Sequence, residues 1–164
     1  MELRSFESVM SALNDRGVRY LLVGGMAVVA HGHGRMTHDI DLVIKLDRDN
    51  ILNAFAALSE LGYQPRIPVT AASFADPANR SAWIAEKGMT VLNLYSERFR
   101  TTPIDIFVVE PFDFDATEIR SLTAEVEGID FRYVDLETLI RMKEDAGRPI
   151  DRDDVFHLRM LQDG

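Results

Sequence analysis

The 164-residue chain contains no cysteine. Disulfides, thiolate metal sites and cysteine nucleophiles are therefore excluded. A chain without cysteine suits a reducing compartment, so the absence agrees with a cytoplasmic protein. Any metal that this protein binds must be held by carboxylates, histidines or other oxygen and nitrogen ligands.

Long hydrophobic runs are also missing. The longest apolar stretch, Leu21 to Ala30, is far shorter than the roughly 20 residues that a membrane-spanning helix needs. The first residues, Met1 to Ser5, contain no hydrophobic segment of the kind found in signal peptides. We therefore expect no membrane span and a cytoplasmic location.

Basic residues are fewer than acidic ones. The chain has 18 Lys and Arg against 27 Asp and Glu, which gives a formal net charge of -9. This balance argues against an extended nucleic-acid-binding surface. A local basic rim stays open, because residues 64–100 include Arg66, Arg80, Lys87, Arg98 and Arg100.

Apolar periodicity and capping residues predict both helices and strands. Helices are expected over residues 2–16, 26–31, 47–61, 135–146 and 151–161. Strands are expected over residues 18–23, 39–45, 90–95 and 104–109, with a hairpin over 122–134. Residues 64–82 contain three prolines and are expected to form a loop with little regular structure.

This pattern predicts one domain over residues 1–164, of the α/β (α+β) class. A mixed β-sheet core over about residues 18–134 would have flanking helices, packed mainly on one side. A pair of helices over about residues 135–162 would complete the domain.

Two carboxylates separated by one residue stand out in the segment His38-Asp39-Ile40-Asp41-Leu42-Val43-Ile44. Strand side chains alternate between faces, so Asp39 and Asp41 should share one face. Neighbouring carboxylates repel each other unless a cation neutralises them. The pair therefore predicts a divalent-cation site.

A third acid, Asp105, lies in the apolar strand Pro103-Ile104-Asp105-Ile106-Phe107. If this strand pairs beside the Asp39–Asp41 strand, three carboxylates converge on one sheet face. Such a site holds Mg²⁺ in enzymes that transfer phosphoryl or nucleotidyl groups. Upstream, the Gly24-Gly25 pair ends an apolar strand and would let the backbone approach a phosphate.

Further motif residues surround the acidic strand: Gly24-Gly25-Met26-Ala27, His31-Gly32, Arg35 and Thr37. With Asp39-Ile40-Asp41-Leu42 and Asp105, they resemble the DNA polymerase β nucleotidyltransferase superfamily. The closer likeness is to its small bacterial members, the abortive-infection type IV toxin-like nucleotidyltransferases. Residues 139–154 are similar to the helical ending of the same group.

The resemblance implies that Asp39, Asp41 and Asp105 bind Mg²⁺, with Mn²⁺ as an alternative, and carry the catalysis. It implies triphosphate contact at Gly24 and Gly25, and nucleotide contacts from three further residues: Arg35, Thr37 and Lys143. Many members have Gly-Ser where this chain has Gly24-Gly25, so a hydroxyl ligand is missing here. The implied substrate is a nucleoside triphosphate, with ATP favoured.

Several of these residues have a second interpretation. Arg35 would also suit a structural ion pair, Thr37 a loop cap, and Lys143 a solvent-reaching surface position. His31 and His33 form a His-x-His pair that suggests zinc, but loop packing or an indirect role is the favoured interpretation.

The leading hypothesis is an Mg²⁺-dependent nucleotidyltransferase whose acceptor hydroxyl belongs to a protein, a tRNA or a small molecule. A second hypothesis is an antibiotic nucleotidyltransferase. A third is a toxin–antitoxin or defence component that acts by binding a cognate protein partner.

Overall fold

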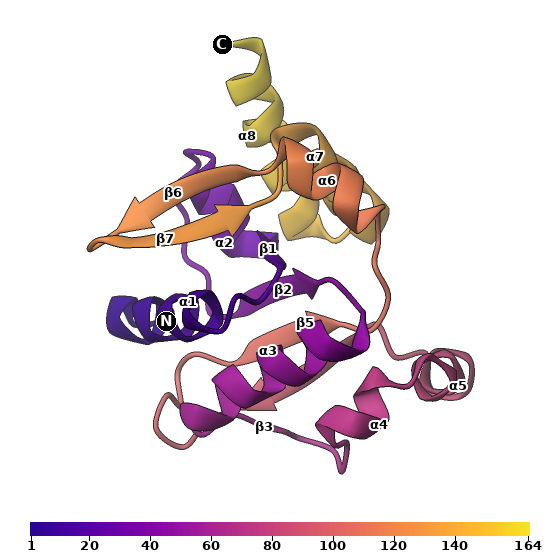
Figure 1. Ribbon diagram of the computed structural model, residues 1–164. Coiled ribbons are helices and arrows are strands. Elements are labelled where there is room, and N and C mark those ends of the chain that lie inside the picture. Colours follow the sequence, from indigo (N-terminus) through magenta and orange to yellow (C-terminus); the bar gives the residue numbers. More distant parts are fainter.

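The computed structural model describes residues 1–164, and a seven-stranded mixed sheet runs through its centre (Figure 1). The strands are β1 (Tyr20–Val23), β2 (Ile40–Ile44), β3 (Gln64–Pro65), β4 (Val91–Tyr95), β5 (Ile104–Phe107), β6 (Leu122–Val126) and β7 (Ile129–Tyr133). The helices are α1 (Leu3–Asp15), α2 (Gly24–Ala30), α3 (Arg48–Glu60), α4 (Ala71–Ala75), α5 (Pro77–Lys87), α6 (Phe114–Arg120), α7 (Leu136–Ala146) and α8 (Pro149–Asp163).

The strand order is β3-β4-β5-β2-β1-β7-β6. The central strand β2 pairs antiparallel with β1 and parallel with β5, and β1 pairs parallel with β7. The parallel β2–β5 pair joins segments about sixty residues apart in sequence. This pairing confirms the mixed sheet that the sequence predicted.

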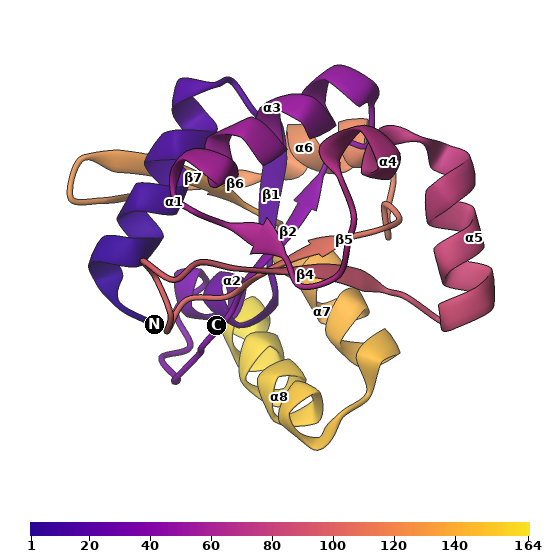
Figure 2. The same cartoon turned by 90° about the horizontal axis from the view of Figure 1, so that it is seen from below.

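Helices cover both faces of the sheet. Figure 2 shows α1, α3 and α4 on one side, with α2, α7 and α8 on the other. All four residues of β1 are buried, as expected for a strand with covered faces. The prediction of helices mainly on one side is therefore wrong. In β4 and β5 buried and half-buried positions alternate, so one face of these strands is less covered.

The segment predicted as a loop over residues 64–82 contains two helices, α4 and part of α5. Thr70 and Ser73 form a capping box at the start of α4. Asp76 accepts a hydrogen bond from Ala78 N, and Pro77 occupies the first turn of α5. Proline is favoured at this position because its missing N–H would have no partner there. Prolines favour loops in the interior of a segment, but Pro77 begins a helix here.

Two helix starts differ from those predicted, and one helix was not predicted. Helix α2 begins at Gly24 rather than at Met26, and α8 begins at Pro149 rather than at Asp151. Helix α6, which begins after the capping residue Asp113, was not predicted from the sequence.

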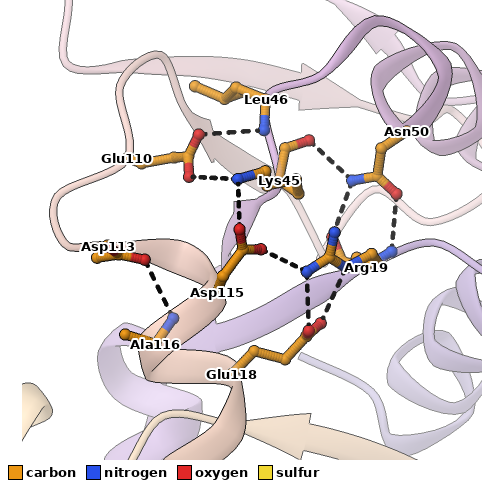
Figure 3. Close-up of polar contacts among 9 residues, drawn as sticks. All are labelled: Arg19, Lys45, Leu46, Asn50, Glu110, Asp113, Asp115, Ala116 and Glu118. Atoms are coloured by element: carbon orange, nitrogen blue, oxygen red, sulfur yellow. Dashed lines mark hydrogen bonds and ion pairs between the residues drawn. The ribbon is translucent and has the colours of Figure 1, made fainter.

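A polar network fastens the end of β2 that lies far from Asp39 (Figure 3). Arg19, just before β1, pairs with Asp115 and Glu118 of α6, and Lys45, just after β2, pairs with Asp115. The buried Asn50 side chain of α3 hydrogen-bonds to the backbone of Arg19 and Lys45. The network thus joins α3 and α6 to the two central strands.

None of the helices is long and apolar enough to cross a membrane.

Candidate active site

The parallel pairing of β2 and β5 brings two of the predicted acids side by side. Asp41 is the register partner of Asp105, and Ile40 N donates a hydrogen bond to Pro103 O at 3.0 Å. Asp39 lies immediately before β2. The expectation that the Asp105 strand pairs beside the Asp39–Asp41 strand is confirmed. We call Asp39, Asp41 and Asp105 the carboxylate triad.

Gly24 lies directly against Asp41. Val23 is the register partner of Asp41, and the chain turns into α2 at Gly24 with a φ of +67°. A Cβ at Gly24 would lie 2.1 Å from Oδ2 of Asp41, which is too close for any other residue. Glycine is therefore required both by the backbone conformation and by the approach of the carboxylate.

The carboxylate triad carries perturbed acids. Burial raises the pKa of Asp41 to about 7, and the charges of Asp105 and Asp39 add to the effect, while Lys143 and Arg148 oppose it. Burial also raises the pKa of Asp105, against a hydrogen bond from Asn93 that lowers it. Partial burial and mutual repulsion therefore make the ionised forms of Asp41 and Asp105 costly.

None of the three carboxylates forms an ion pair with a side chain of this protein. Their only side-chain hydrogen bond runs from Asn93 Nδ2 to Asp105 Oδ1, at 2.7 Å. Mg²⁺ takes oxygen ligands from a few carboxylates and completes its shell with water and phosphate oxygens. The donor set of the triad fits this ion.

Gly25 is covered by the loop that leads to β2. A Cβ at Gly25 would lie 2.4 Å from the Thr37 hydroxyl oxygen and 3.1 Å from Nη2 of Arg35. The Thr37 hydroxyl therefore occupies the place beside Gly25 where a serine side chain would project.

Arg35 and Lys143 both lie in a cluster of charges at the start of α8. We call Arg35, Lys143, Arg148, Asp151 and Asp154 the C-terminal ion cluster. Arg35 binds Asp154 through two hydrogen bonds of 2.8 and 3.0 Å. Lys143 Nζ lies 3.2 Å from Asp151 Oδ1 and 3.0 Å from Asp154 Oδ2. Both aspartates are fully buried and Lys143 is nearly so.

The cluster tests the structural interpretations of Arg35 and Lys143, but not their contacts with a nucleotide. Arg35 makes the ion pair that was the alternative interpretation, and Lys143 is buried rather than a solvent-reaching surface lysine. The charge of Lys143 lowers the pKa of Asp41, so it acts on the triad electrostatically. Contact of either residue with a triphosphate stays a prediction.

Three residues near the triad were not predicted as site residues. Asn93 is the register partner of Asp105, Arg66 hydrogen-bonds to Asn93, and Arg148 acts electrostatically on Asp41. The Arg148 side chain is 68% exposed and can reach a ligand. The alternation of residues 91–95 places Asn93 on the opposite face from Leu92 and Leu94. The sequence did not show that this strand pairs with the strand of Asp105.

The structure narrows two sequence-based alternatives, the basic rim and the His-x-His zinc site. Arg80 is buried and donates to the Phe74 carbonyl, so it cannot contribute to a basic rim, whereas the other four basic residues are exposed: Arg66, Lys87, Arg98 and Arg100. His31 donates Nε2–H to the Val134 carbonyl at 2.8 Å and packs on Tyr133. Its ring is thus engaged away from His33, and the His-x-His pair does not form a zinc site by itself.

The sequence matches the family described as nucleotidyl transferase AbiEii toxin, type IV toxin–antitoxin system, over residues 9–152. The chain belongs to the AbiEii family. It is accordingly a nucleotidyltransferase, as the motifs predicted. A comparison with curated proteins gave no match.

Solved structures share the fold of this AbiEii family member. The lincosamide antibiotic adenylyltransferase LnuA, solved with lincomycin bound, is 16% identical with a TM-score of 0.60, covering 98% of both chains. The antibiotic-resistance factor ANT(2'')-Ia is 15% identical with a TM-score of 0.57, covering 95% of this chain and 80% of that one. An antigenic nucleotidyltransferase-like protein from Paracoccidioides brasiliensis is 18% identical with a TM-score of 0.56, covering 98% and 76%.

Proposed function

We propose that this AbiEii family member transfers a nucleoside monophosphate from a triphosphate, with ATP favoured, to an acceptor hydroxyl in an Mg²⁺-dependent reaction. The observation that carries the proposal is the carboxylate triad, in which Asp41 and Asp105 are register partners and no carboxylate has an ion-pair partner. A group of partly buried acids without ion-pair partners is costly unless a cation completes it. Bound Mg²⁺, or Mn²⁺ as an alternative, would activate the attacking hydroxyl and neutralise the leaving pyrophosphate.

Different residues would bind the metal and the triphosphate. Asp39, Asp41 and Asp105 would hold the metal, and Asp41 would give up its proton on metal binding because its pKa lies near neutrality. The backbone at Gly24 and Gly25 and the Thr37 hydroxyl would contact the triphosphate, since Gly24 lies against Asp41 and the Thr37 hydroxyl lies beside Gly25.

Cationic side chains beside the triad would bind the phosphates. Arg148 is the best placed, because it is exposed and its charge acts on Asp41. Arg35 and Lys143 would support it from the C-terminal ion cluster. A nucleotide contact from Arg35 would use a guanidinium that already has a buried carboxylate partner.

The acceptor is proposed as a class only. A protein, a tRNA end or a small molecule would each supply a hydroxyl, and the acidic net charge disfavours a large nucleic-acid surface. The family is that of a type IV toxin–antitoxin system, so a cognate antitoxin is the proposed protein partner. An antibiotic acceptor is the second candidate, because LnuA and ANT(2'')-Ia share this fold.

The test is mass spectrometry of candidate acceptors incubated with each nucleoside triphosphate and Mg²⁺, beside calorimetric titration of the triphosphate. We expect transfer of one nucleotide by the wild-type protein and a loss of at least about a hundredfold in Asp105→Asn, because metal-site electrostatics contribute several kcal/mol. Asp130→Asn, which changes an exposed strand aspartate, is the matched control.

The proposal is wrong if no acceptor gains a nucleotide and no triphosphate binds in the presence of Mg²⁺ or Mn²⁺. Triphosphate binding with unchanged activity in Asp105→Asn would contradict the role of the triad. Resistance to lincosamides or aminoglycosides on expression would favour the antibiotic acceptor. A toxic phenotype that persists in Asp41→Asn would favour partner binding over catalysis.

A further inference from the structure

A second group of metal-ligating side chains lies outside the carboxylate triad. His33, in the loop between α2 and β2, meets Asp153 and His157 of α8. One ligand atom from each residue lies within 4.8 Å of the others. We call these three residues the His33 cluster. It includes only one histidine of the His-x-His pair, because His31 turns away to Val134.

The three side chains of the His33 cluster lie close together in the fold. Asp153 and His157 are four residues apart on α8 and therefore project from one side of the helix. His157 donates Nδ1–H to the Asp153 backbone carbonyl at 2.9 Å, which leaves the lone pair of Nε2 free. The rings of His33 and His157 stack with centroids 4.0 Å apart. A hydrogen bond of this kind at the other ring nitrogen is typical of metal-ligating histidines.

We propose that the His33 cluster binds a borderline divalent cation, with Zn²⁺ as the ion that it fits best. Two imidazoles and one carboxylate are a common zinc ligand set, whereas Mg²⁺ prefers oxygen ligands alone. Zinc–nitrogen distances of about 2.0 Å place tetrahedral ligand atoms roughly 3.3 Å apart, so the three groups must move closer together. One of the two stacked rings must also turn, because an imidazole binds a metal in the plane of its own ring. The side chains of Asp153 and His157 are 61% and 37% exposed, which leaves them free to rotate.

The position of the cluster indicates what the ion would do. The loop after α2 runs along α8 and contacts it at three levels: Leu161 lies 3.9 Å from the Cβ position of Gly32, His157 stacks on His33, and Asp154 binds Arg35. This same loop carries Thr37 and Asp39 to the triad. A cation on the middle contact would hold the loop on α8 and so order the triphosphate side of the site.

Isothermal titration with ZnCl₂, in excess Mg²⁺ to fill the carboxylate triad, tests the proposal. We expect one high-affinity zinc per chain in the wild-type protein and in the control His38→Gln, which changes an exposed histidine of the same loop. We expect affinity at least about tenfold weaker in His33→Gln and in His157→Gln. Zinc should also shift the imidazole ¹⁵N resonances of His33 and His157, but not those of His31.

An unchanged zinc titration in either folded variant would overturn the proposal, as would zinc-induced shifts confined to other histidines. Asp153→Asn, on an exposed turn of α8, gives a third variant if circular dichroism shows that one histidine variant is unfolded. These readouts are independent of nucleotidyl transfer. A failure of zinc binding would therefore leave the proposed function intact. A failure of nucleotidyl transfer would likewise leave the zinc proposal intact.

Discussion

At the scale of single residues, Asp41 shows how a functional carboxylate conflicts with stability. Its pKa of about 7 means that, between about pH 4 and pH 7, the folded protein holds a proton that the unfolded chain, with a pKa of about 3.9, has already lost. The stabilising contribution is therefore complete below about pH 4 and falls as the pH rises to about 7. Above that pH the metal-free fold contains a buried, repelling charge.

We therefore expect Asp41→Asn to stabilise the metal-free protein at pH 8, by up to about 2–4 kcal/mol, because a shift of one pKa unit corresponds to about 1.4 kcal/mol. The gain should shrink at pH 5. In Mg²⁺ the order should reverse, since only the wild-type protein gains stability from the ion. Thermal unfolding in EDTA and in MgCl₂ measures both effects. A variant less stable than wild type in EDTA at pH 8 would contradict the pKa of Asp41.

At the scale of elements, the position of the carboxylate triad depends on the hydrogen bonds that hold β1 and β2 in place. The Asn50 side chain of α3 accepts a hydrogen bond from Arg19 N at 2.8 Å. It donates hydrogen bonds to the carbonyls of Arg19 and Lys45 at 2.9 and 2.8 Å. One buried amide thus satisfies backbone groups beyond the ends of both strands. Because β2 carries Asp39 and Asp41, its position at the site depends on this contact at its other end.

Asn50→Ala should lower the free energy of unfolding by about 2–4 kcal/mol, because it leaves the Arg19 N–H and the Lys45 carbonyl without partners, while the Arg19 carbonyl keeps the bond from Lys45 N. Asn53→Ala, at an exposed position of the same helix, should change it by less than about 0.5 kcal/mol. Urea unfolding followed by circular dichroism compares the two. Equal stabilities would show that water replaces the Asn50 side chain at no cost.

At the scale of the whole molecule, the C-terminal ion cluster joins α7, α8 and the loop before β2. Burial raises the pKa of Asp151, but hydrogen bonds from Arg148 and Lys143 outweigh it and the pKa is lowered to about 2. A depressed acid contributes stability above its unfolded pKa and loses it as the pH falls through the folded value. This contribution should therefore be lost between about pH 4 and pH 2.

Asp151→Asn should cost about 2–3 kcal/mol at pH 7, and the difference from wild type should close as the pH falls from about 4 to 2. Asp145→Asn, at an exposed position of α7, is the matched control and should behave as wild type. Denaturant midpoints measured across this pH range provide the comparison. A difference that stays constant with pH would mean that Asp151 acts through packing rather than charge.

Much of the molecule was predictable because its signals are local. The alternation of Asp39 and Asp41 with apolar residues required only the period of a strand, and Asp105 showed the same pattern. The capping residue Asp47 and the closing Gly147 marked helix ends through hydrogen bonding and backbone conformation that depend on a few neighbours. The family resemblance followed from these short motifs.

Other features depend on which distant segments meet, and no local pattern contains that information. Only the fold showed that β5 lies beside β2 in the register that pairs Asp41 with Asp105. The environment of Lys143 was likewise decided by α8, which places two buried aspartates against it.

The sequence by itself determined the chemistry that this protein carries, because acids, glycines and their spacing are properties of short segments. The tertiary structure decided which groups lie together: the Thr37 hydroxyl beside Gly25, and His33 beside His157 rather than His31. The physical reason is that charge, burial and coordination depend on distances between side chains, and those distances are established only when the chain packs.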